Sequence, residues 1–350
     1  MVRSRSIIAT PPGAAIKEQL DDRHMSQKEF AARMDMSEKH ISKLINGEVQ
    51  LTKDVAVRLE MVLGVPASFW NNLESIYREK IIRANAENAM DEDIELIKHL
   101  PYAEMATLGW VPKTRDAREK VINTRKFFEV VELPLLNNVK VTNIACRRLA
   151  VSEKADFALM AWAQKAKIEA RSIETSAINV KKLAEIVPEI RRMTVKKPVE
   201  FCPEIKKCLS ECGIALVFLP HLKGSFLQGA TFYDGNKIVV GLTARGKDAD
   251  KFWFSLFHEL AHIILGHVGK PEGTTDEDEN MANDWASNAL IPENDFDLFV
   301  AKRDYSEESV IQFASEQGIA PGIVVGRMQR KDVIKYNMLN DLKEKYVIAT

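Results

Sequence analysis

One stretch decides the fold of the C-terminal half of this chain, Lys251-Phe-Trp-Phe-Ser-Leu-Phe-His-Glu-Leu-Ala-His-Ile-Ile-Leu-Gly-His267. Its apolar residues leave almost no polar face, which predicts a helix buried on all sides. His258, Glu259 and His262 interrupt that apolar run. Two histidines and a glutamate are costly to bury without a partner. The stretch therefore predicts a buried helix whose polar side chains share a ligand.

The spacing of these three residues indicates which ligand. Residues four apart on a helix lie about 40° apart round the axis and roughly 6 Å along it, so His258 and His262 can hold one metal ion. Glu259 then lies beside any water bound to that ion. This H-E-x-x-H pattern is typical of zinc hydrolases, in which two imidazoles bind Zn²⁺ and the glutamate takes a proton from the attacking water. The alternative is a buried helix with two hydrogen-bonded histidines.

A third zinc ligand is required, with the fourth position left to water. His267 is out of step with a third-histidine pattern, and we expect it at the helix end, where a histidine suits the C-terminal dipole. The better candidate is Glu279, which opens a helix that Pro292 ends. Asn283, one turn later, can hydrogen-bond to a ligating histidine.

Three acidic neighbours are rival ligands to Glu279. Asp276, Glu277 and Asp278 directly precede it, and they also fit a solvated run of charge. The helical register favours Glu279.

The residues around this site resemble a known family. Phe252 to His262, then Glu279-x-x-Ala-Asn-x-Trp-Ala286 and Leu290-Ile-Pro292, are similar to the ImmA/IrrE zinc metallopeptidases. The resemblance spans roughly residues 205 to 330 and departs from the family pattern at Trp285, where phenylalanine is usual. It implies His258, His262 and Glu279 as zinc ligands and Glu259 as the catalytic carboxylate.

Length and composition indicate the number of folded units and the general class of the protein. A chain of 350 residues predicts two or three folded units, and its 46% hydrophobic content supports folded domains. We find no apolar run of 18 residues and no signal peptide, so we expect no membrane span and a cytoplasmic location. The cysteines are Cys146, Cys202, Cys208 and Cys212; they form no C-x-x-C pair and are expected to be reduced thiols.

The N-terminal segment predicts a series of short helices. We expect the first at 14–23, a second begun by the capping box Ser26-Gln-Lys-Glu29, and a third capped by Ser37 and closed by Asn46-Gly47. Thr52 and Ser68 are the expected caps of the fourth and fifth, which end at Gly64 and near Asn85. Phe30, Ala31 and Met34 are predicted to face inward.

The second and third helices fit a helix-turn-helix unit that lays its second helix in the major groove of DNA. Glu38, Lys39, His40 and Lys43 would face the bases, with Gln27 and Asn46 near phosphates and Ser37 at the helix start. Residues 1–66 contain ten lysines and arginines against nine aspartates and glutamates, so charge alone does not distinguish DNA binding from a plain helical bundle.

The local pattern is more specific than the charge. Met25 to Arg33 and Ser37 to Glu48 look like a phage-repressor helix-turn-helix, and Pro12-Gly13 with Phe69 to Leu73 narrow the resemblance to HigA-like antitoxins. That resemblance implies a homodimer on double-stranded, palindromic operator DNA, and a cognate toxin as a further partner.

The middle of the chain predicts a helical connector and then a small sheet. Helical spacing dominates 86–200, with Pro188 and Pro198 as expected boundaries, and a helix follows at 203–212. The apolar run 214–219 fits a central strand. Residues 230–233 and 238–242 flank Asp-Gly-Asn, which indicates a hairpin. We expect a mostly antiparallel sheet whose edge strand can pair with an extended peptide.

These observations combine into one hypothesis. The fold class is mainly α with a small α+β zincin-like domain, divided into a five-helix helix-turn-helix domain (12–85), a helical connector (86–200) and a metallopeptidase-like domain (201–350). The function is a DNA-binding, repressor-like or antitoxin-like regulator with a zinc metallo-endopeptidase that hydrolyses a regulatory protein, either a repressor or the chain itself. The alternative is a repressor or antitoxin whose zincin fold senses a ligand, toxin or metal without proteolysis.

Overall fold

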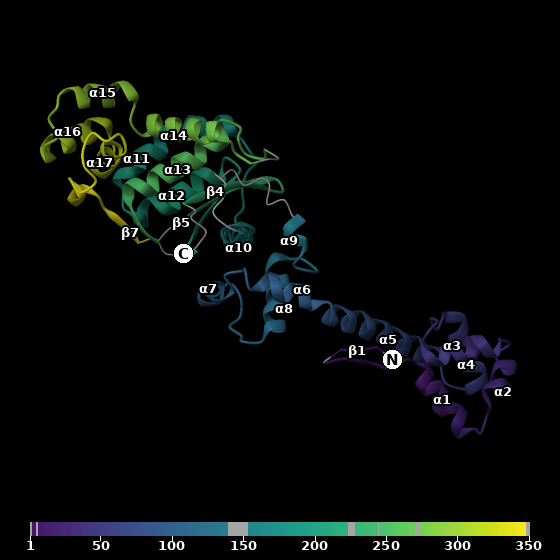
Figure 1. Cartoon of the computed structure of the whole chain (residues 1–350). Helices are drawn as coiled ribbons and strands as arrows, with labels where there is room; N and C mark the ends of the chain where they lie inside the picture. The colour runs from purple at the N-terminus through teal and green to yellow at the C-terminus, as the bar shows by residue number, and fades with distance from the viewer. Residues whose placement is uncertain are drawn as a thin grey trace. The chain divides into compact units, whose positions relative to one another are not determined.

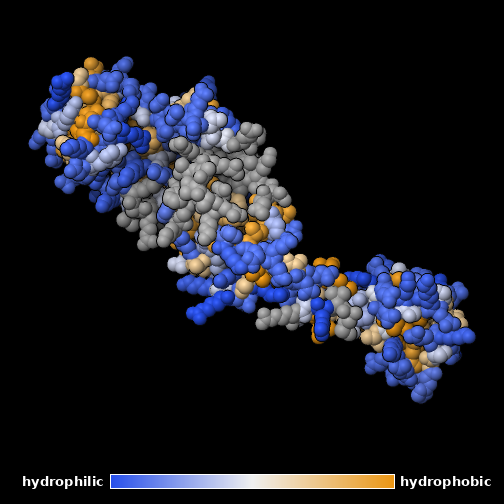
Figure 2. Space-filling model, viewed as in Figure 1, coloured by the Kyte–Doolittle hydropathy of each residue, from blue (hydrophilic) through white to orange (hydrophobic). Residues whose placement is uncertain are grey.

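The computed structural model describes residues 2–4, 6–138, 153–222, 228–243, 245–270 and 273–347 (Figure 1). The chain divides into two compact units, Met1–Ile94 and Glu95–Thr350. Each has its own hydrophobic core. Cys146 lies outside the described residues, and Cys202, Cys208 and Cys212 are free thiols. Among the residues coloured by hydropathy, hydrophilic ones predominate on the visible face of each unit (Figure 2).

The first unit is a helical bundle preceded by a short hairpin. Its elements are β1 (Val2–Arg3), β2 (Ile8–Ala9), α1 (Gly13–Asp22), α2 (Gln27–Arg33), α3 (Glu38–Asn46), α4 (Lys53–Leu63) and α5 (Ala67–Asn88), with α6 (Met90–Ile97) crossing into the second unit.

Side-chain caps fix the helix starts of this bundle. The hydroxyls of Ser26, Ser37 and Thr52 each accept a hydrogen bond from the backbone N–H three residues on, which satisfies a donor that the helix leaves unpaired. Gly47 and Gly64 end α3 and α4 in the left-handed conformation that glycine adopts without strain. These caps were predicted.

The predicted start of the fifth helix is wrong. α5 begins at Ala67 after Pro66 and continues to Asn88, so Ser68 lies inside the first turn rather than at the cap. Pro66 supplies no side-chain cap; instead, the Ala67 N–H donates a hydrogen bond of 2.8 Å to the Glu60 carboxylate.

The core of the first unit confirms the predicted inward face of α2. Phe30, Ala31 and Met34 are buried with residues of α1, α3 and α4. Gly13 lies against the backbone of Ile45, where a Cβ would be only 2.0 Å from the Ile45 carbonyl oxygen. Glycine at this position therefore lets α1 approach α3 closely.

The second unit combines many helices with a small sheet. Its helices before the sheet are α7 (Tyr102–Thr107), α8 (Ala117–Phe128), α9 (Leu135–Asn138), α10 (Glu153–Ala170), α11 (Val180–Arg192), a 3₁₀ turn (Met193–Val195) and α12 (Pro198–Ser210). The sheet and later elements are β3 (Ile214–Leu219), β4 (Gly229–Asp234), β5 (Lys237–Thr243), β6 (Arg245–Asp248), α13 (Ala249–Ile264), α14 (Asp276–Leu290), α15 (Glu293–Ala301), α16 (Glu307–Gln317), α17 (Pro321–Arg330), a second 3₁₀ turn (Asn340–Leu342) and β7 (Lys345–Val347).

The three-stranded sheet has the order β3-β5-β4. β4 and β5 form the predicted antiparallel hairpin, whereas β3 pairs parallel with β5. The sheet is therefore mixed rather than mostly antiparallel. The expected central strand is also wrong, because β5 lies in the middle and β3 at one side.

Burial of β3 on both faces explains why its apolar sequence predicted a central strand. Ile214, Leu216 and Phe218 belong to the core that contains α12 and α13. α10 packs against β3 and β5, and its Trp162 meets Gly241, where a Cβ would be 2.7 Å from the indole. A strand covered on both faces has a continuous apolar sequence whatever its place in the order.

Two proline boundaries also differ from expectation. Pro188 lies inside α11, and Pro203 lies inside α12, which begins at Pro198. Pro198 begins α12 and occupies its first turn, where proline is tolerated. Among the described helices, none is long and apolar enough to cross a membrane.

Candidate functional site

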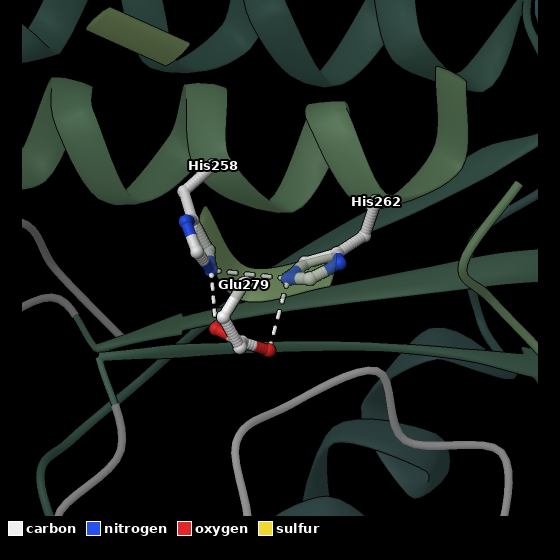
Figure 3. A group of neighbouring side chains, drawn as sticks. All are labelled: His258, His262 and Glu279. Carbon is white, nitrogen blue, oxygen red and sulfur yellow. Dashed lines mark hydrogen bonds and ion pairs between the residues drawn. The ribbon is translucent and has the colours of Figure 1, made fainter. Parts of the chain in front are cut away.

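α13 presents His258 and His262 toward each other on one face (Figure 3). Their Nε2 atoms lie 3.0 Å apart. The His262 side chain is fully buried, and that of His258 is 16% exposed. The helix therefore directs one nitrogen of each imidazole to a shared point that remains open on the His258 side.

α14 brings Glu279 to the same point. Thr275 caps this helix and forms a reciprocal capping box with Asp278, which fixes the first turn. Glu279 Oε2 lies 3.3 Å from His258 Nε2, and its Oε1 lies 3.5 Å from His262 Nε2 (Figure 3). Thr274 donates a hydrogen bond of 2.7 Å to Oε1. The carboxylate thus spans both imidazoles.

The acidic neighbours of Glu279 point elsewhere. Asp278 accepts hydrogen bonds from Lys270 at 2.7 and 2.8 Å. Asp276 and Glu277 are exposed. Within the described residues, Glu279 is therefore the acidic side chain that faces both histidines.

The three side chains fit a divalent cation. Their donor atoms all lie within 4.8 Å of one another; the two Nε2 atoms are 3.0 Å apart, and they lie 3.3 and 3.5 Å from separate oxygens of Glu279. Zinc–ligand bonds of roughly 2.0–2.1 Å give donor separations of about 3.3 Å. Two imidazoles and a carboxylate are also the donors of several catalytic zinc sites, so these residues could hold zinc.

Burial and the neighbouring charges shift the pKa values of all three side chains. Burial, and then the charge of His258, lower the pKa of His262 to about 4. Burial opposes charge on His258, but its hydrogen bond to Glu279 and the charges of Glu259 and Glu279 raise its pKa. Burial raises the pKa of Glu279, yet the hydrogen bonds from His258 and Thr274 lower it more. A neutral His262 and an ionised Glu279 are the forms that bind metal, whereas the raised pKa of His258 means that this imidazole must release a proton to do so.

Glu259 lies beside this centre against strand β4. It is 4% exposed, and Thr231 donates a hydrogen bond of 2.6 Å to its Oε2. A Cβ at Gly229 would lie 2.5 Å from Oε1, so glycine makes room for the carboxylate. The sequence did not single out Gly229 or Thr231, because their role depends on the packing of β4 against α13.

His267 lies at the end of α13, as predicted, where its N–H donates to the His262 carbonyl at 2.8 Å, but its side chain has other partners than the helix dipole. α13 ends at Ile264, and Gly266 turns the chain back with φ of +73°. His267 is consequently buried behind the site, with its Nδ1 3.1 Å from His262 Nδ1 and its Nε2 3.4 Å from Asp278 Oδ1. It is a partner of His262 rather than a residue facing the helix dipole. Gly266 as a helix-ending glycine was the sequence feature that could have indicated this.

Asn283 lies one turn beyond Glu279 and is half-buried. Its side chain contributes to the raised pKa of His258, after the larger effects of burial and the two glutamates. The Nδ1 atom of His258 is buried and has no hydrogen-bond partner within the geometric limits among the described residues. Asn283 is therefore beside the ring that it was predicted to orient.

The first unit holds the second group of predicted site residues. Of the residues predicted to contact DNA, five are exposed on α2 and α3: Gln27, Glu38, Lys39, Lys43 and Asn46. Ser37 is occupied as the cap of α3, and His40 is half-buried. Ser42 is exposed between Glu38 and Asn46 on the same helical face; helical register alone could have identified it.

Comparisons with known proteins find a family match in each of two parts of the chain. A helix-turn-helix family matches residues 16–70, and a peptidase family described as the IrrE N-terminal-like domain matches residues 217–328. The uncharacterised HTH-type transcriptional regulator YddM of Escherichia coli (strain K12) is 34% identical over 80 residues, which cover 23% of this chain and 81% of that protein.

A solved structure is also similar to part of this chain. It is an addiction module antidote protein of the HigA family from Coxiella burnetii, with 25% identity, a TM-score of 0.22, and coverage of 24% of this chain and 92% of that chain.

The fold and the two sites define a DNA-binding regulator joined to a peptidase-family domain. The chain belongs to the HTH-type transcriptional regulators, and its second unit contains the IrrE N-terminal-like domain.

Proposed function

We propose that the second unit is a zinc-dependent endopeptidase that hydrolyses a regulatory protein. The observation that supports this most is the approach of His258, His262 and Glu279 to one point with Glu259 alongside. A zinc site that serves only structure is closed by four protein ligands, whereas three ligands leave a position for water. A carboxylate beside that position suits catalysis.

Each of the four residues has a distinct task in this proposal. His258, His262 and Glu279 hold the cation, which when bound polarises a carbonyl and lowers the pKa of water. Glu259 takes the proton of the attacking water and delivers it to the leaving amine. Thr231 keeps the Glu259 carboxylate oriented through its hydrogen bond of 2.6 Å.

Strand β4 is the proposed binding edge for the substrate. It lies at one side of the three-stranded sheet, and its Thr231 contacts the catalytic carboxylate. An extended peptide that adds to such an edge is held by main-chain hydrogen bonds. The scissile bond would then lie near Glu259.

The first unit is proposed to direct the protein to its operator DNA. The exposed face of α3, with Lys39 and Lys43, is proposed to enter the major groove of operator DNA. Val57 and Met61 lie one turn apart on α4 and are 46% and 81% exposed, which supports a homodimer on a palindromic operator. A cognate toxin is a further partner that the antitoxin resemblance implies, and the proposed operator binding supports a cytoplasmic location.

The proposed substrate is a regulator bound at the same operator, either another repressor or this chain itself. The alternative is a sensor that binds a ligand, toxin or metal without cleaving protein. Both require the fold, but only hydrolysis requires the Glu259 carboxylate.

Two variants test the peptidase proposal. Glu279→Ala should lose stoichiometric zinc in metal analysis of the purified full-length protein. Glu259→Gln should keep zinc and operator binding but lose both substrate cleavage and derepression. Derepression that continues unchanged in Glu259→Gln would favour the sensor.

A further inference from the structure

Arg330 is an exposed, positively charged side chain close to the candidate metal centre. It is the last residue of α17, and its guanidinium carbon lies 3.3 Å from the centre of the Phe254 ring. The centre of that ring is 6.3 Å from the centre of the His258 ring. Together these two distances place the guanidinium less than about 10 Å from the His258 imidazole.

Arg330 and Phe254 lie on the side where the centre is open. Phe254 precedes His258 by four residues on α13, so both side chains lie on one face of that helix. Of the two imidazoles, that of His258 is the exposed one. Phe254 is half-buried and Arg330 is exposed. The surface that these two residues form therefore adjoins the opening through which a substrate reaches the centre.

The contact with Phe254 determines how the guanidinium is presented. A separation of 3.3 Å is close to the contact distance of carbon atoms, roughly 3.5 Å, so the planar guanidinium lies flat on the ring. Cation–π attraction stabilises this arrangement. The N–H groups of a guanidinium lie in its own plane. Stacking on one face therefore leaves its edge available for hydrogen bonds.

The charge of Arg330 is not balanced by a neighbour. None of the described residues forms an ion pair with Arg330. The adjacent Lys331, by contrast, pairs with Glu293 at 3.6 Å. The charge of Asp250 acts on Arg330, but Lys343 already donates a hydrogen bond of 2.9 Å to the Asp250 carboxylate. Arg330 is consequently a cation that still lacks a counter-ion within the described part of the chain.

Contact with the protein also withdraws part of this cation from water. Burial lowers the pKa of Arg330, and it outweighs the charges of Tyr336 and Asp250, which raise it. A charge in partly desolvated surroundings attracts an incoming anion more strongly than a charge in bulk water does. The surroundings of Arg330 therefore favour an anionic ligand.

A small cavity beside this pair limits where such a ligand can lie. Lys251, Phe254, Ser287 and Arg330 are among the residues that line it, and its volume is about 40 Å³. A cavity of that size has room for water but not for a side chain. A ligand must therefore bind Arg330 from the solvent side rather than enter the cavity.

We propose that Arg330 binds the carboxylate of an acidic side chain, aspartate or glutamate, of the peptide substrate, an inference that rests on the proposed peptidase function. The edge of a guanidinium carries two parallel N–H donors that match the two oxygens of a carboxylate. An extended peptide advances roughly 3.3 Å per residue. The acidic residue therefore lies within about four residues of the scissile bond.

Other side chains bind Arg330 less strongly. A lysine side chain is repelled by the guanidinium. A glutamine side chain offers one neutral oxygen, which accepts a weaker hydrogen bond than a carboxylate does. Exposed ion pairs contribute up to roughly fivefold in affinity, and hydrogen bonds to charged groups roughly tenfold or more. Because Arg330 is exposed but partly desolvated, we expect a preference of about five- to tenfold for glutamate over glutamine.

Binding without turnover tests this preference. Zinc-loaded, full-length Glu259→Gln protein is titrated with octapeptides of alanine and serine that are amidated at the C-terminus and labelled with an uncharged fluorophore. Each position in turn contains glutamate, glutamine or lysine. Fluorescence anisotropy should give a dissociation constant about five- to tenfold lower for glutamate than for glutamine at one position. Equal binding of glutamate and glutamine at every position, or no measurable binding of any peptide, would overturn the proposal.

Variants of Arg330 in the same Glu259→Gln protein show whether the preference comes from this residue. Arg330→Gln should keep its zinc and bind the glutamate and glutamine peptides equally. Arg330→Lys, which keeps the charge but loses the planar edge, should recover only part of the preference. Arg330→Glu should favour lysine over glutamine at the same position, a reversal that a purely structural role of the stacked side chain does not produce.

Lys331→Gln is the matched control. It removes the same charge one residue later, from a side chain that is already paired with Glu293, and it should leave the preference for glutamate intact. A preference that survives in zinc-loaded Arg330→Gln protein would contradict the assignment, because the carboxylate would then bind the zinc or another group.

These outcomes are separate from those of the peptidase test. Zinc-dependent cleavage that Glu259→Gln abolishes, together with equal binding of glutamate and glutamine, would refute the role of Arg330 and retain the peptidase. A preference that follows Arg330 in a protein that cleaves no peptide would retain the contact and refute hydrolysis.

Discussion

At the scale of single residues, the candidate centre depends on contacts that no local pattern encodes. The H-E-x-x-H spacing predicted that His258 and His262 face one point, because helix geometry alone determines that direction. Thr231 and His267 reach the site through a strand and a chain reversal. Their roles follow from tertiary packing, which the sequence pattern does not contain.

The hydroxyl of Thr231 provides a first prediction. Thr231→Val preserves the shape of the side chain but removes the hydrogen bond to Glu259. We expect kcat for a cleaved peptide to fall by roughly 10- to 100-fold, because general base catalysis depends on the placement of the carboxylate. Thr231→Ser should retain most of the activity. Equal activity of the valine and serine variants would contradict this role.

His267 gives a second prediction, which concerns metal affinity. Its Nδ1 lies 3.1 Å from His262 Nδ1 and orients that imidazole. Loss of such an outer partner typically costs about 10- to 100-fold in metal affinity, so His267→Ala should release zinc to a competing chelator at a lower chelator concentration. The exposed His221 supplies the control, since His221→Ala should bind zinc like the unmodified protein.

At the scale of elements, the helix caps and the hairpin were predictable because each depends on a few adjacent residues. Ser37, Thr52 and the Asp-Gly-Asn turn are examples. The order of the strands was not predictable, because covering β3 by helices on both faces produces the same apolar run as a central position. Pro188 likewise gave no indication that α11 continues through it.

The cap of α14 provides a prediction at this scale. Thr275→Ala removes the cap from the helix that begins with the proposed ligand, which should lower the free energy of unfolding by about 1 kcal/mol. Ser306→Ala removes a similar cap from α16 and should cost about as much. Only Thr275→Ala should also weaken zinc binding in a chelator competition, and equal zinc affinity in the two variants would argue against a role of this cap in the site.

At the scale of the whole molecule, the two cores are separate clusters of residues. The substitutions that affect DNA binding are therefore expected to differ from those that affect the candidate metal centre. The predicted helical connector, 86–200, is not one separate segment. Its helix α10 packs against the sheet, and its helix α11 packs against α13 of the second unit. Amphipathic spacing identified these helices but could not specify what they cover.

Charge on α3 gives the prediction at this scale. Lys39→Ala and Lys43→Ala should each weaken operator binding and, where the lysine contacts a phosphate, reduce the slope of log K against log salt by about 1. Zinc content should be unchanged in both. Lys80→Ala, on the exposed side of α5, serves as the control in the same gel-shift titration; an equal loss of binding in this variant would show non-specific charge attraction instead.

The reciprocal cap at the start of α14 has a thermodynamic consequence. Asp278 closes the cap with Thr275 and also lies 3.4 Å from His267 Nε2, so helix start and imidazole support share one carboxylate. Binding of a cation by Glu279 should therefore stabilise the first turn of α14. Amide hydrogen exchange at Glu279, whose N–H is bonded to the Thr275 carbonyl at 3.0 Å, should slow as zinc is added and quicken when it is stripped away.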